Sequence, residues 1–263
     1  MISGVNAREL ILEILLQIEE EGEHSHIAIR NALSKHQFLP KQERSFITRV
    51  CEGTLEYRIY IDYVINSFSK VTVDKMKPQI REILRSAVYQ LKFMDSVPDS
   101  AVCNEAVKLA QRKGFYNLKP FVNGVLRTIA REIDNIKLPS REENEIQYLS
   151  VKYSMPEALV LRWISNYGVE KTELMLADFL KEKPVTVRCR IHKTPKMEIV
   201  ESLRAQGVKV EQAPYLPYAL RISNYNHILT LDAFLQGKIQ VQDVSSMLVA
   251  EVAAPQKGDY IID

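Results

Sequence analysis

The sequence predicts an α+β protein with more than one domain. The 263 residues exceed the usual size of a single domain. Apolar residues recur at helical spacing through the first half of the chain, and they alternate as in strands from Pro184 onward. We divide the chain into an all-helical domain at 1–140, connecting helices at 141–183, a small α+β subdomain at 184–240 and the start of a further α/β domain at 241–263.

Seven helices are expected in the first domain. Their apolar residues lie three or four positions apart, and Gly22 and Gly53 end two of the runs. The expected helices cover residues 10–18, 27–33, 41–52, 59–68, 80–91, 102–110 and 121–129. Several short helices with short connections predict a compact helical domain.

The segment NIKLPSREENEIQYLS, residues 135–150, is polar, contains a proline and carries mixed charge. This composition is typical of a linker between domains. Two further helices are expected after it, at 156–167 and 170–179.

The period changes in the second half of the chain. PVTVRCRI alternates apolar and polar residues and predicts a strand, and TPKMEIVESLRAQG predicts a helix that ends at Gly207. VKVEQ, YALRI and KIQVQ predict further strands, and DVSSMLVAEVA predicts a helix capped by Asp243 or Ser245. The last residues, GDYIID, are interpreted as a turn and a short apolar strand. An unpaired apolar strand is an aggregation risk, so we expect deletion of 241–263 to improve solubility.

The net charge of +2 conceals an uneven distribution. Residues 75–131 contain 11 Lys and Arg against 4 Asp and Glu, whereas residues 1–74 contain 8 against 11. Focused positive charge is typical of a protein that binds a phosphate backbone, although a solvated helix surface has the same composition. The candidate phosphate contacts in this stretch are Arg81, Arg85, Lys92, Arg112, Lys113, Lys119, Arg127 and Arg131.

The residues alone indicate no catalytic site. The nine glycines form neither GxGxxG nor a P-loop, and the three cysteines and five histidines lack the spacing of a metal site. No apolar run approaches the ~18 residues of a membrane helix, and the start has no basic leader. We expect a cytoplasmic, monomeric protein without a metal or a membrane segment.

Several segments resemble known families. REILRSAVYQLKFMDSVPDSAVCNEAVKLAQRKG and LKPFVNGVLR, with ARELILEILLQIEE and ERSFITRVCEGTLEYRIYID, strongly resemble the NusB-like RNA-binding domain over about residues 5–135. YSMPEALVLRWISNYG, PVTVRCRIHKTPKMEIVESLRAQGVKVE and IQVQDVSSMLVAEVAAPQKGDYIID are similar to the region ahead of the catalytic core in Sun-type rRNA cytosine-5 methyltransferases. The order of the two parts resembles that in the B group of bacterial small-subunit rRNA methyltransferases.

The resemblance implies an enzyme that transfers a methyl group from S-adenosylmethionine to carbon 5 of a cytosine in 16S rRNA. It implies a ferredoxin-like subdomain followed by a Rossmann-like catalytic domain. In that family the strand similar to YIID leads into the cofactor loop, and two cysteines further on carry out catalysis. The chain ends at Asp263, so the resemblance implies an inactive fragment without catalytic or cofactor-binding residues. Gln242 and Asp243 are expected to support the active site.

Two other functions remain open. A free-standing NusB-like RNA-binding or antitermination factor would account for residues 1–135 but leaves the α+β unit without a role. The other open function is a protein-binding scaffold that uses the helical domain to contact a partner. The codons after Asp263 distinguish them, because a cysteine- and glycine-rich loop would support the methyltransferase and a stop codon a binding module.

Overall fold

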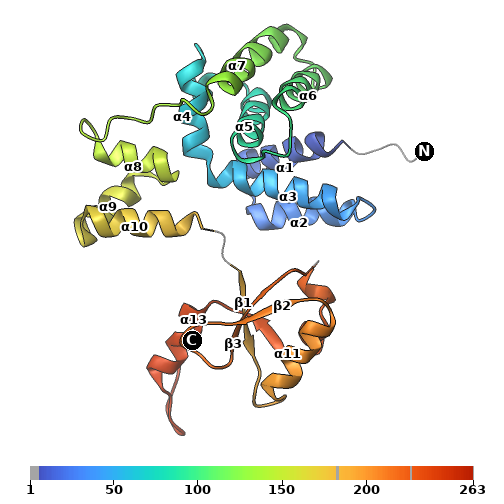
Figure 1. Ribbon diagram of the computed structural model, residues 1–263, viewed down its shortest axis with the longest axis vertical. Coiled ribbons are helices and arrows are strands. Elements are labelled where there is room, and N and C mark those ends of the chain that lie inside the picture. Colours follow the sequence, from blue (N-terminus) through green and yellow to red (C-terminus); the bar gives the residue numbers. More distant parts are fainter. Residues whose placement is uncertain (1–5, 182–183, 226, 263) are drawn as a thin grey trace. The chain divides into compact units, whose positions relative to one another are not determined.

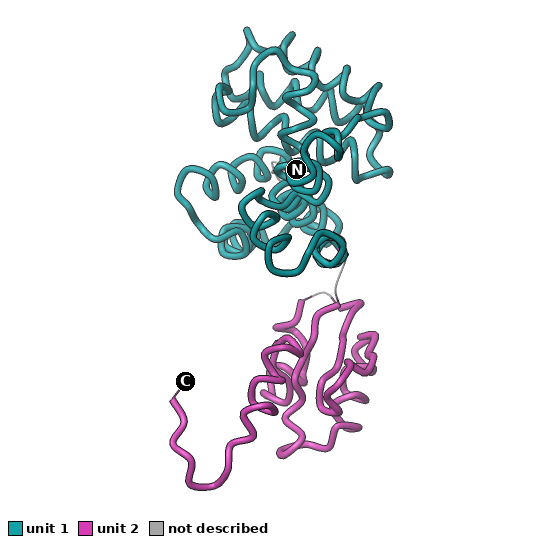
Figure 2. The backbone as a smooth tube through the Cα atoms, turned by 90° about the vertical axis from the view of Figure 1, so that its left-hand side faces the viewer, with its two compact units in different colours: residues 1–180 teal, residues 181–263 magenta. Residues whose placement is uncertain are grey.

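The computed structural model describes residues 6–181, 184–225 and 227–262. The chain divides into two compact units, residues 1–180 and 181–263 (Figures 1 and 2). The first unit is helical, and the second contains a small sheet, which confirms the predicted α+β class with several domains. The helices expected as a connecting segment belong to the first unit, and the expected boundary at 183 lies outside the described residues.

All seven helices expected in the first 140 residues are present, together with three more before residue 180. Their bounds are α1 Ala7–Glu21, α2 Ser25–Lys35, α3 Lys41–Glu56, α4 Arg58–Phe68, α5 Pro78–Phe93, α6 Asp99–Arg112, α7 Lys119–Glu132, α8 Glu145–Tyr153, α9 Glu157–Tyr167 and α10 Val169–Phe179. Two short 3₁₀ turns, Val73–Lys75 and Tyr116–Leu118, precede α5 and α7.

Helix α5 is the centre of the first unit. It contacts α1, α3, α4, α6 and α7, which surround it in Figure 1. Pro78 begins the helix, where its missing N–H group costs no hydrogen bond. Every residue from Glu82 to Leu91 is buried, so the polar side chains of α5 have to find partners inside the protein. This requirement determines the environment of Arg85.

Helix α8 was not expected, because its first turns lie in the polar segment interpreted as a linker. Asn144 provides the start signal, since its side chain accepts a hydrogen bond from the backbone N–H of Gln147 at 3.0 Å. Helices α8, α9 and α10 each contribute one fully buried residue, Leu149, Val160 and Leu176, to a small core. Helix α8 also contacts α4, which joins these helices to the first unit.

The second unit is built on a four-stranded antiparallel sheet in the order β2–β3–β1–β4. Its elements are β1 Val185–Cys189, α11 Lys196–Ala205, β2 Lys209–Gln212, β3 Ala219–Ser223, a 3₁₀ turn at Ile228–Thr230, α12 Asp232–Leu235, β4 Ile239–Val241 and α13 Val244–Ala253. The four expected strands are therefore present, and they connect as a ferredoxin-like unit does. The short helix α12 was not expected.

The alternation in β1 has the predicted effect. Val187 and Cys189 are buried on one face of the sheet, where they pack with Leu220 of β3 and with Ile199 and Leu203 of α11. The buried residues of this core all belong to the second unit, so it is separate from the core of the first unit.

The end of the chain differs from the expectation in two ways. Residues 259–262 form no strand, and Tyr260 and Ile262 are 101% and 94% exposed. A strand requires a hydrogen-bonded neighbour, and none of the described residues pairs with this segment; Asp263 lies outside them. Helix α13 is not separate from the preceding subdomain either, because Met247 is 1% exposed and packs with Ala213, Leu216 and Ala219.

Candidate nucleic-acid interface

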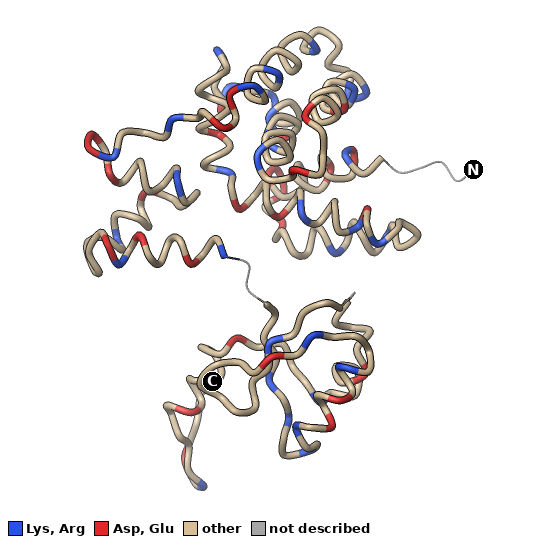
Figure 3. The backbone as a smooth tube through the Cα atoms, viewed as in Figure 1, with Lys and Arg blue, Asp and Glu red and all other residues tan. Residues whose placement is uncertain are grey.

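The eight basic candidates lie on α5, at the end of α6, at the turn that follows it and on α7. Figure 3 shows the charged residues along the chain, with basic and acidic positions interspersed in the first unit. A cation that is already paired with a carboxylate has less charge to offer to a phosphate. The ion-pair partners of each residue therefore decide which candidates remain available.

Arg85 does not lie on an exposed basic face, contrary to the expectation from its spacing. It is 7% exposed, and it donates to both carboxylate oxygens of Asp62 at 2.7 Å. It also donates to Glu82 at 2.6 Å and to Glu19 at 3.1 Å. Burial opposes the charge, but the hydrogen bonds to Asp62 and the nearby carboxylates outweigh it and raise the pKa of Arg85. The guanidinium is a structural cation.

Arg81 belongs to the same network. Its Nη2 lies 2.8 Å from Glu19, and its Nη1 donates to the carbonyl of Val73 at 3.3 Å. Burial acts to raise the pKa of Glu19, but hydrogen bonding and charge from Arg81 prevail and lower it. Arg81 and Arg85 therefore lie on the same face of α5, as their spacing predicts. That face is directed toward the acids of α1 and α4 and not toward solvent.

Three further candidates are paired near the surface. Lys92 donates to the carbonyl of Ile133 at 3.2 Å and lies 3.5 Å from Asp134. Arg112 lies 3.4 Å from Glu9, and Lys113 lies 3.2 Å from Glu13. Both acids are on α1, so these contacts link the end of α6 to the first helix.

Lys119, Arg127 and Arg131 remain. All three are exposed residues of α7, and none has a carboxylate partner within the described ranges. Arg127 is held by neutral amides, since it donates to Asn104 at 3.2 Å and to Asn123 at 3.3 Å. These contacts orient the guanidinium without neutralising it. Among the eight candidates, the cations without a carboxylate partner in the described residues therefore all lie on α7.

A groove of 470 Å³ lies between α6 and α7, beside Arg127. Its volume is within the range of small-ligand sites. It is lined by Asn104, Val107, Lys108, Gln111, Lys119, Pro120 and Asn123. Charge counting along the sequence does not reveal this groove, because five of the seven lining residues are uncharged amides or apolar.

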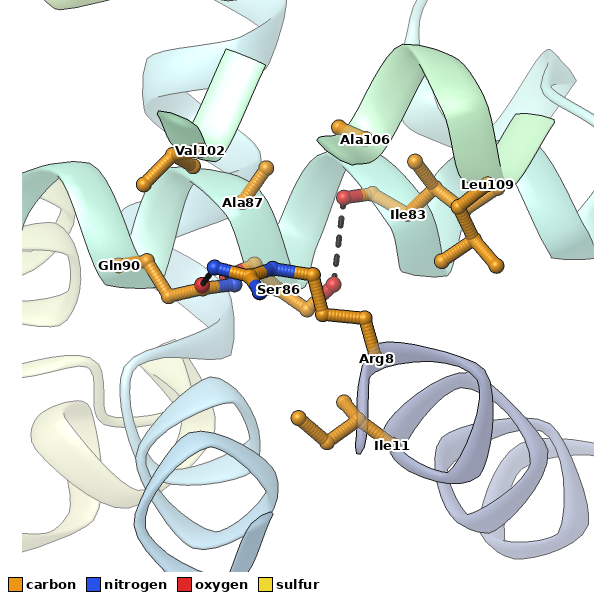
Figure 4. Close-up of a pocket in the computed structure, with 9 residues that line it drawn as sticks. All are labelled: Arg8, Ile11, Ile83, Ser86, Ala87, Gln90, Val102, Ala106 and Leu109. Atoms are coloured by element: carbon orange, nitrogen blue, oxygen red, sulfur yellow. Dashed lines mark hydrogen bonds between the residues drawn. The ribbon is translucent and has the colours of Figure 1, made fainter. Parts of the chain in front are cut away.

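A second cavity, between α1, α5 and α6, contains a cation that sequence reasoning missed. Arg8 points into it and donates to Gln90 at 3.2 Å (Figure 4). Burial lowers the pKa of Arg8, while the charge of Glu105 acts in the opposite direction. The cavity measures only 10 Å³, which is room for about one water molecule. It is a packing gap and not a ligand site.

The two residues expected to support an active site lie where β4 leads into α13. Asp243 caps the helix, since its carboxylate accepts from the backbone N–H of Ser245 at 3.2 Å and from the Ser245 hydroxyl at 2.5 Å. The backbone N–H of Gln242 donates to Thr186 at 3.2 Å, and its side-chain oxygen is buried without a partner in the described structure. Between the two alternatives, Asp243 is the cap and Ser245 supports it.

The three cysteines are buried. Burial raises the pKa of the Cys51 thiol strongly and that of Cys189 to about 11, so neither is a reactive thiolate at neutral pH. Across residues 6–181, 184–225 and 227–262 there is no cluster of three metal-ligating side chains. None of the helices in these ranges has the length and hydropathy needed to cross a bilayer.

Comparison with known proteins extends these observations. Residues 5–131 match the NusB family, and residues 155–228 match the family described as "Methyltr_RsmF/B-like, ferredoxin-like domain". The chain is 30% identical over 260 residues to the "Probable ribosomal RNA small subunit methyltransferase B" of Bacillus subtilis (strain 168). That match covers 98% of this chain and 57% of the relative. The protein described in the same words from Synechocystis sp. is also 30% identical, with 98% and 58% covered.

A solved structure, "Crystal Structure of PH0851", has a similar fold, with a TM-score of 0.71 and 24% identity over 97% of this chain and 57% of that one. The chain thus spans less than two thirds of the length of these relatives. Both halves of the chain nevertheless match a family, in the order expected from the sequence. Residues 5–131 are similar to the NusB family, and residues 155–228 are similar to the ferredoxin-like domain of RsmF/B-like methyltransferases.

Proposed function

We propose that this chain is the RNA-positioning part of an S-adenosylmethionine-dependent rRNA (cytosine-C5) methyltransferase that acts on 16S rRNA in the cytoplasm. The observation that carries the proposal is the order of the two matched regions, NusB-like and then ferredoxin-like. The similarity to relatives named as small-subunit rRNA methyltransferases covers both regions and 98% of this chain. The unneutralised cations of α7 support RNA as the partner of the helical unit.

A division of labour between the parts explains why a methyltransferase needs this chain. Contacts to phosphates fix the position of an RNA without reading its sequence. An enzyme that modifies a base also needs that base unstacked or in a single-stranded region. A helical unit that holds the surrounding RNA would present such a base to a catalytic domain.

S-adenosylmethionine would supply the methyl group, but the described residues form no cradle for it. Gly258, the glycine nearest the end of the chain, has a φ of 105° and no atom within 4 Å of the position a Cβ would occupy. Residues 249–262 around it are exposed. We therefore assign no step of methyl transfer to the residues of this chain.

RNA binding is tested with the 263-residue chain and a fluorescent fragment of small-subunit rRNA. The logarithm of the binding constant should fall linearly with the logarithm of the salt concentration, because each bound phosphate releases counterions. Replacing Lys119, Arg127 and Arg131 by Ala should lower the slope by about 0.7–0.9 for each phosphate that the variant no longer binds. The matched control replaces three exposed cations outside α5–α7, Arg30, Lys35 and Lys41, and should change the slope much less.

Two results would count against the proposal. One is wild-type binding that does not depend on salt. The other is a control set that loses as much affinity as the α7 set. The enzymatic part is tested separately, with the product of the complete reading frame, rRNA and labelled S-adenosylmethionine. Label on carbon 5 of a cytosine is the expected result, and its absence would refute the assigned chemistry.

A further inference from the structure

The groove between α6 and α7 offers hydrogen-bond donors around an apolar floor. Val107 and Pro120 provide apolar surface, and Lys119 provides a cation without a carboxylate partner in the described chain. Lys108 also lines the groove, but it lies 2.7 Å from Glu105 and is partly neutralised. An apolar floor with a cationic rim suits a ligand that has both a flat ring and an anionic group.

The amides at the rim reinforce this preference. Arg127 has only donors, so Asn104 and Asn123 must present their oxygens to it, as the contacts at 3.2 and 3.3 Å require. Their nitrogens are left as donors. Together with the Lys119 ammonium they form a rim that favours acceptor-rich groups, such as phosphate oxygens and base carbonyls.

Gly124 is a second and independent observation. It lies inside α7, four residues after Pro120 and three before Arg127, and therefore on the groove side of the helix. Its φ is not positive, so the backbone does not require glycine. A Cβ at this position would meet no atom within 4 Å, so packing does not require glycine either.

Glycine at an exposed position inside a helix lowers stability relative to alanine. Neither conformation nor packing within the folded chain offsets this cost at Gly124. What glycine does provide is a bare stretch of helix surface on which another molecule can approach the backbone closely. The bare surface adjoins the donor-rich groove, so both features point to the same ligand.

We propose that the α6–α7 groove holds one unstacked nucleotide of single-stranded RNA. The base lies on Val107 and Pro120, and the sugar-phosphate backbone passes over Gly124 between Lys119 and Arg127. This inference rests on the proposed RNA-binding function and specifies where and in what form the RNA is bound. The excess of unpaired cations favours RNA over a protein segment as the occupant.

Substitution of Gly124 gives a test in which stability and binding respond in opposite directions. In the 263-residue chain, Gly124→Ala should raise the melting temperature, because alanine is the better helix former. It should also weaken binding of a short, labelled single-stranded RNA of mixed sequence by several-fold. Gly124→Leu keeps a high helix propensity but covers the bare surface, and it should weaken binding at least tenfold. A perfectly paired RNA duplex should be affected much less by either change.

The matched control is Asn31, an exposed residue inside α2. Asn31→Ala and Asn31→Leu make a comparable change of helix propensity and bulk on a helix that does not line the groove, and they should leave RNA binding unchanged. The inference is overturned, with the proposed function intact, if the wild type binds RNA and Gly124→Leu binds it equally tightly. It is also overturned if duplex RNA loses as much affinity as single-stranded RNA. If the wild type binds no RNA, both proposals fall.

Discussion

Glu82 is a buried carboxyl group whose protonation affects the stability of the helical unit. It is 3% exposed and lies 2.6 Å from Arg85. Burial raises the pKa of Glu82 to about 7, although the charge of Arg85 acts in the opposite direction. A carboxyl group whose pKa is higher in the folded state than in the unfolded chain stabilises the fold when protonated. Its contribution is complete below the ordinary value of 4.5 and is lost as the pH rises to about 7.

The direction of this pKa shift gives a prediction for Glu82→Gln, a substitution that keeps the shape of the side chain but removes its ability to ionise. The free energy of unfolding of the wild type should fall relative to that of the variant between about pH 5 and pH 8. Urea unfolding followed by helical circular dichroism at both pH values measures the difference, and the titrating groups that do not interact with Glu82 cancel because both proteins share them. A difference that does not change with pH would show that Glu82 is ionised throughout this range in the folded protein.

The fates of Arg85 and Arg127 explain why the candidate site could be predicted only in part. Both are arginines on the helices of the same basic stretch, so local sequence does not distinguish them. Their difference lies in partners that are distant in sequence: Arg85 donates to Asp62 and Glu19, whereas the partners of Arg127 in the described residues are the neutral amides of Asn104 and Asn123. Composition indicates a basic region, but only the tertiary structure shows which charges are already neutralised.

At the scale of elements, α3 and α5 approach each other closely at Gly53. A Cβ at this position would lie 2.1 Å from Cζ of Tyr89. The Tyr89 ring cannot withdraw easily, because its centroid lies 5.3 Å from that of Phe93 and 6.3 Å from that of Tyr57. We expect Gly53→Ala to lower the free energy of unfolding by about 1–3 kcal/mol, as overpacking does.

Chemical denaturation of the wild type, Gly53→Ala, Tyr89→Ala and the double variant measures this effect. In the Tyr89→Ala background Gly53→Ala should cost much less, since the clash is gone. Equal costs in the two backgrounds would show that the ring is not the obstacle. Gly124→Ala is the natural comparison, because the same substitution there meets open space.

The secondary-structure elements were predicted best where the apolar residues keep a regular spacing over many positions. The apolar stripe of residues 80–91 predicted the central helix, which runs from Pro78 to Phe93. Helix α8 was missed because its start signal, Asn144, lies in a polar stretch that also fits a linker. The strand expected at the end of the chain has the right composition, but strand formation depends on a partner as well as on composition.

At the scale of the whole molecule, the two units have separate cores and should unfold as separate transitions. Helix α13 packs on a separate, smaller buried cluster of the second unit. It buries Met247 against Ala213 and Ala219, and its Glu251 accepts a hydrogen bond from the hydroxyl of Tyr218 at 2.6 Å. The sequence predicted that deletion of 241–263 would improve solubility, whereas the packing of α13 now leads us to expect the opposite.

Two truncations separate the contribution of α13 from that of the exposed end. Deletion of 254–263 removes only exposed chain among the residues the structure describes, so it should leave both transitions unchanged. Deletion of 241–263 also removes Met247 and the pairing of Val241 with Val187, and it should destabilise the second unit by at least ~2 kcal/mol. Calorimetry would record a lower melting temperature for the second unit and an unchanged one for the first unit, and light scattering would show more aggregation. An unchanged transition of the second unit after the longer deletion would mean that α13 contributes nothing to the stability of that unit.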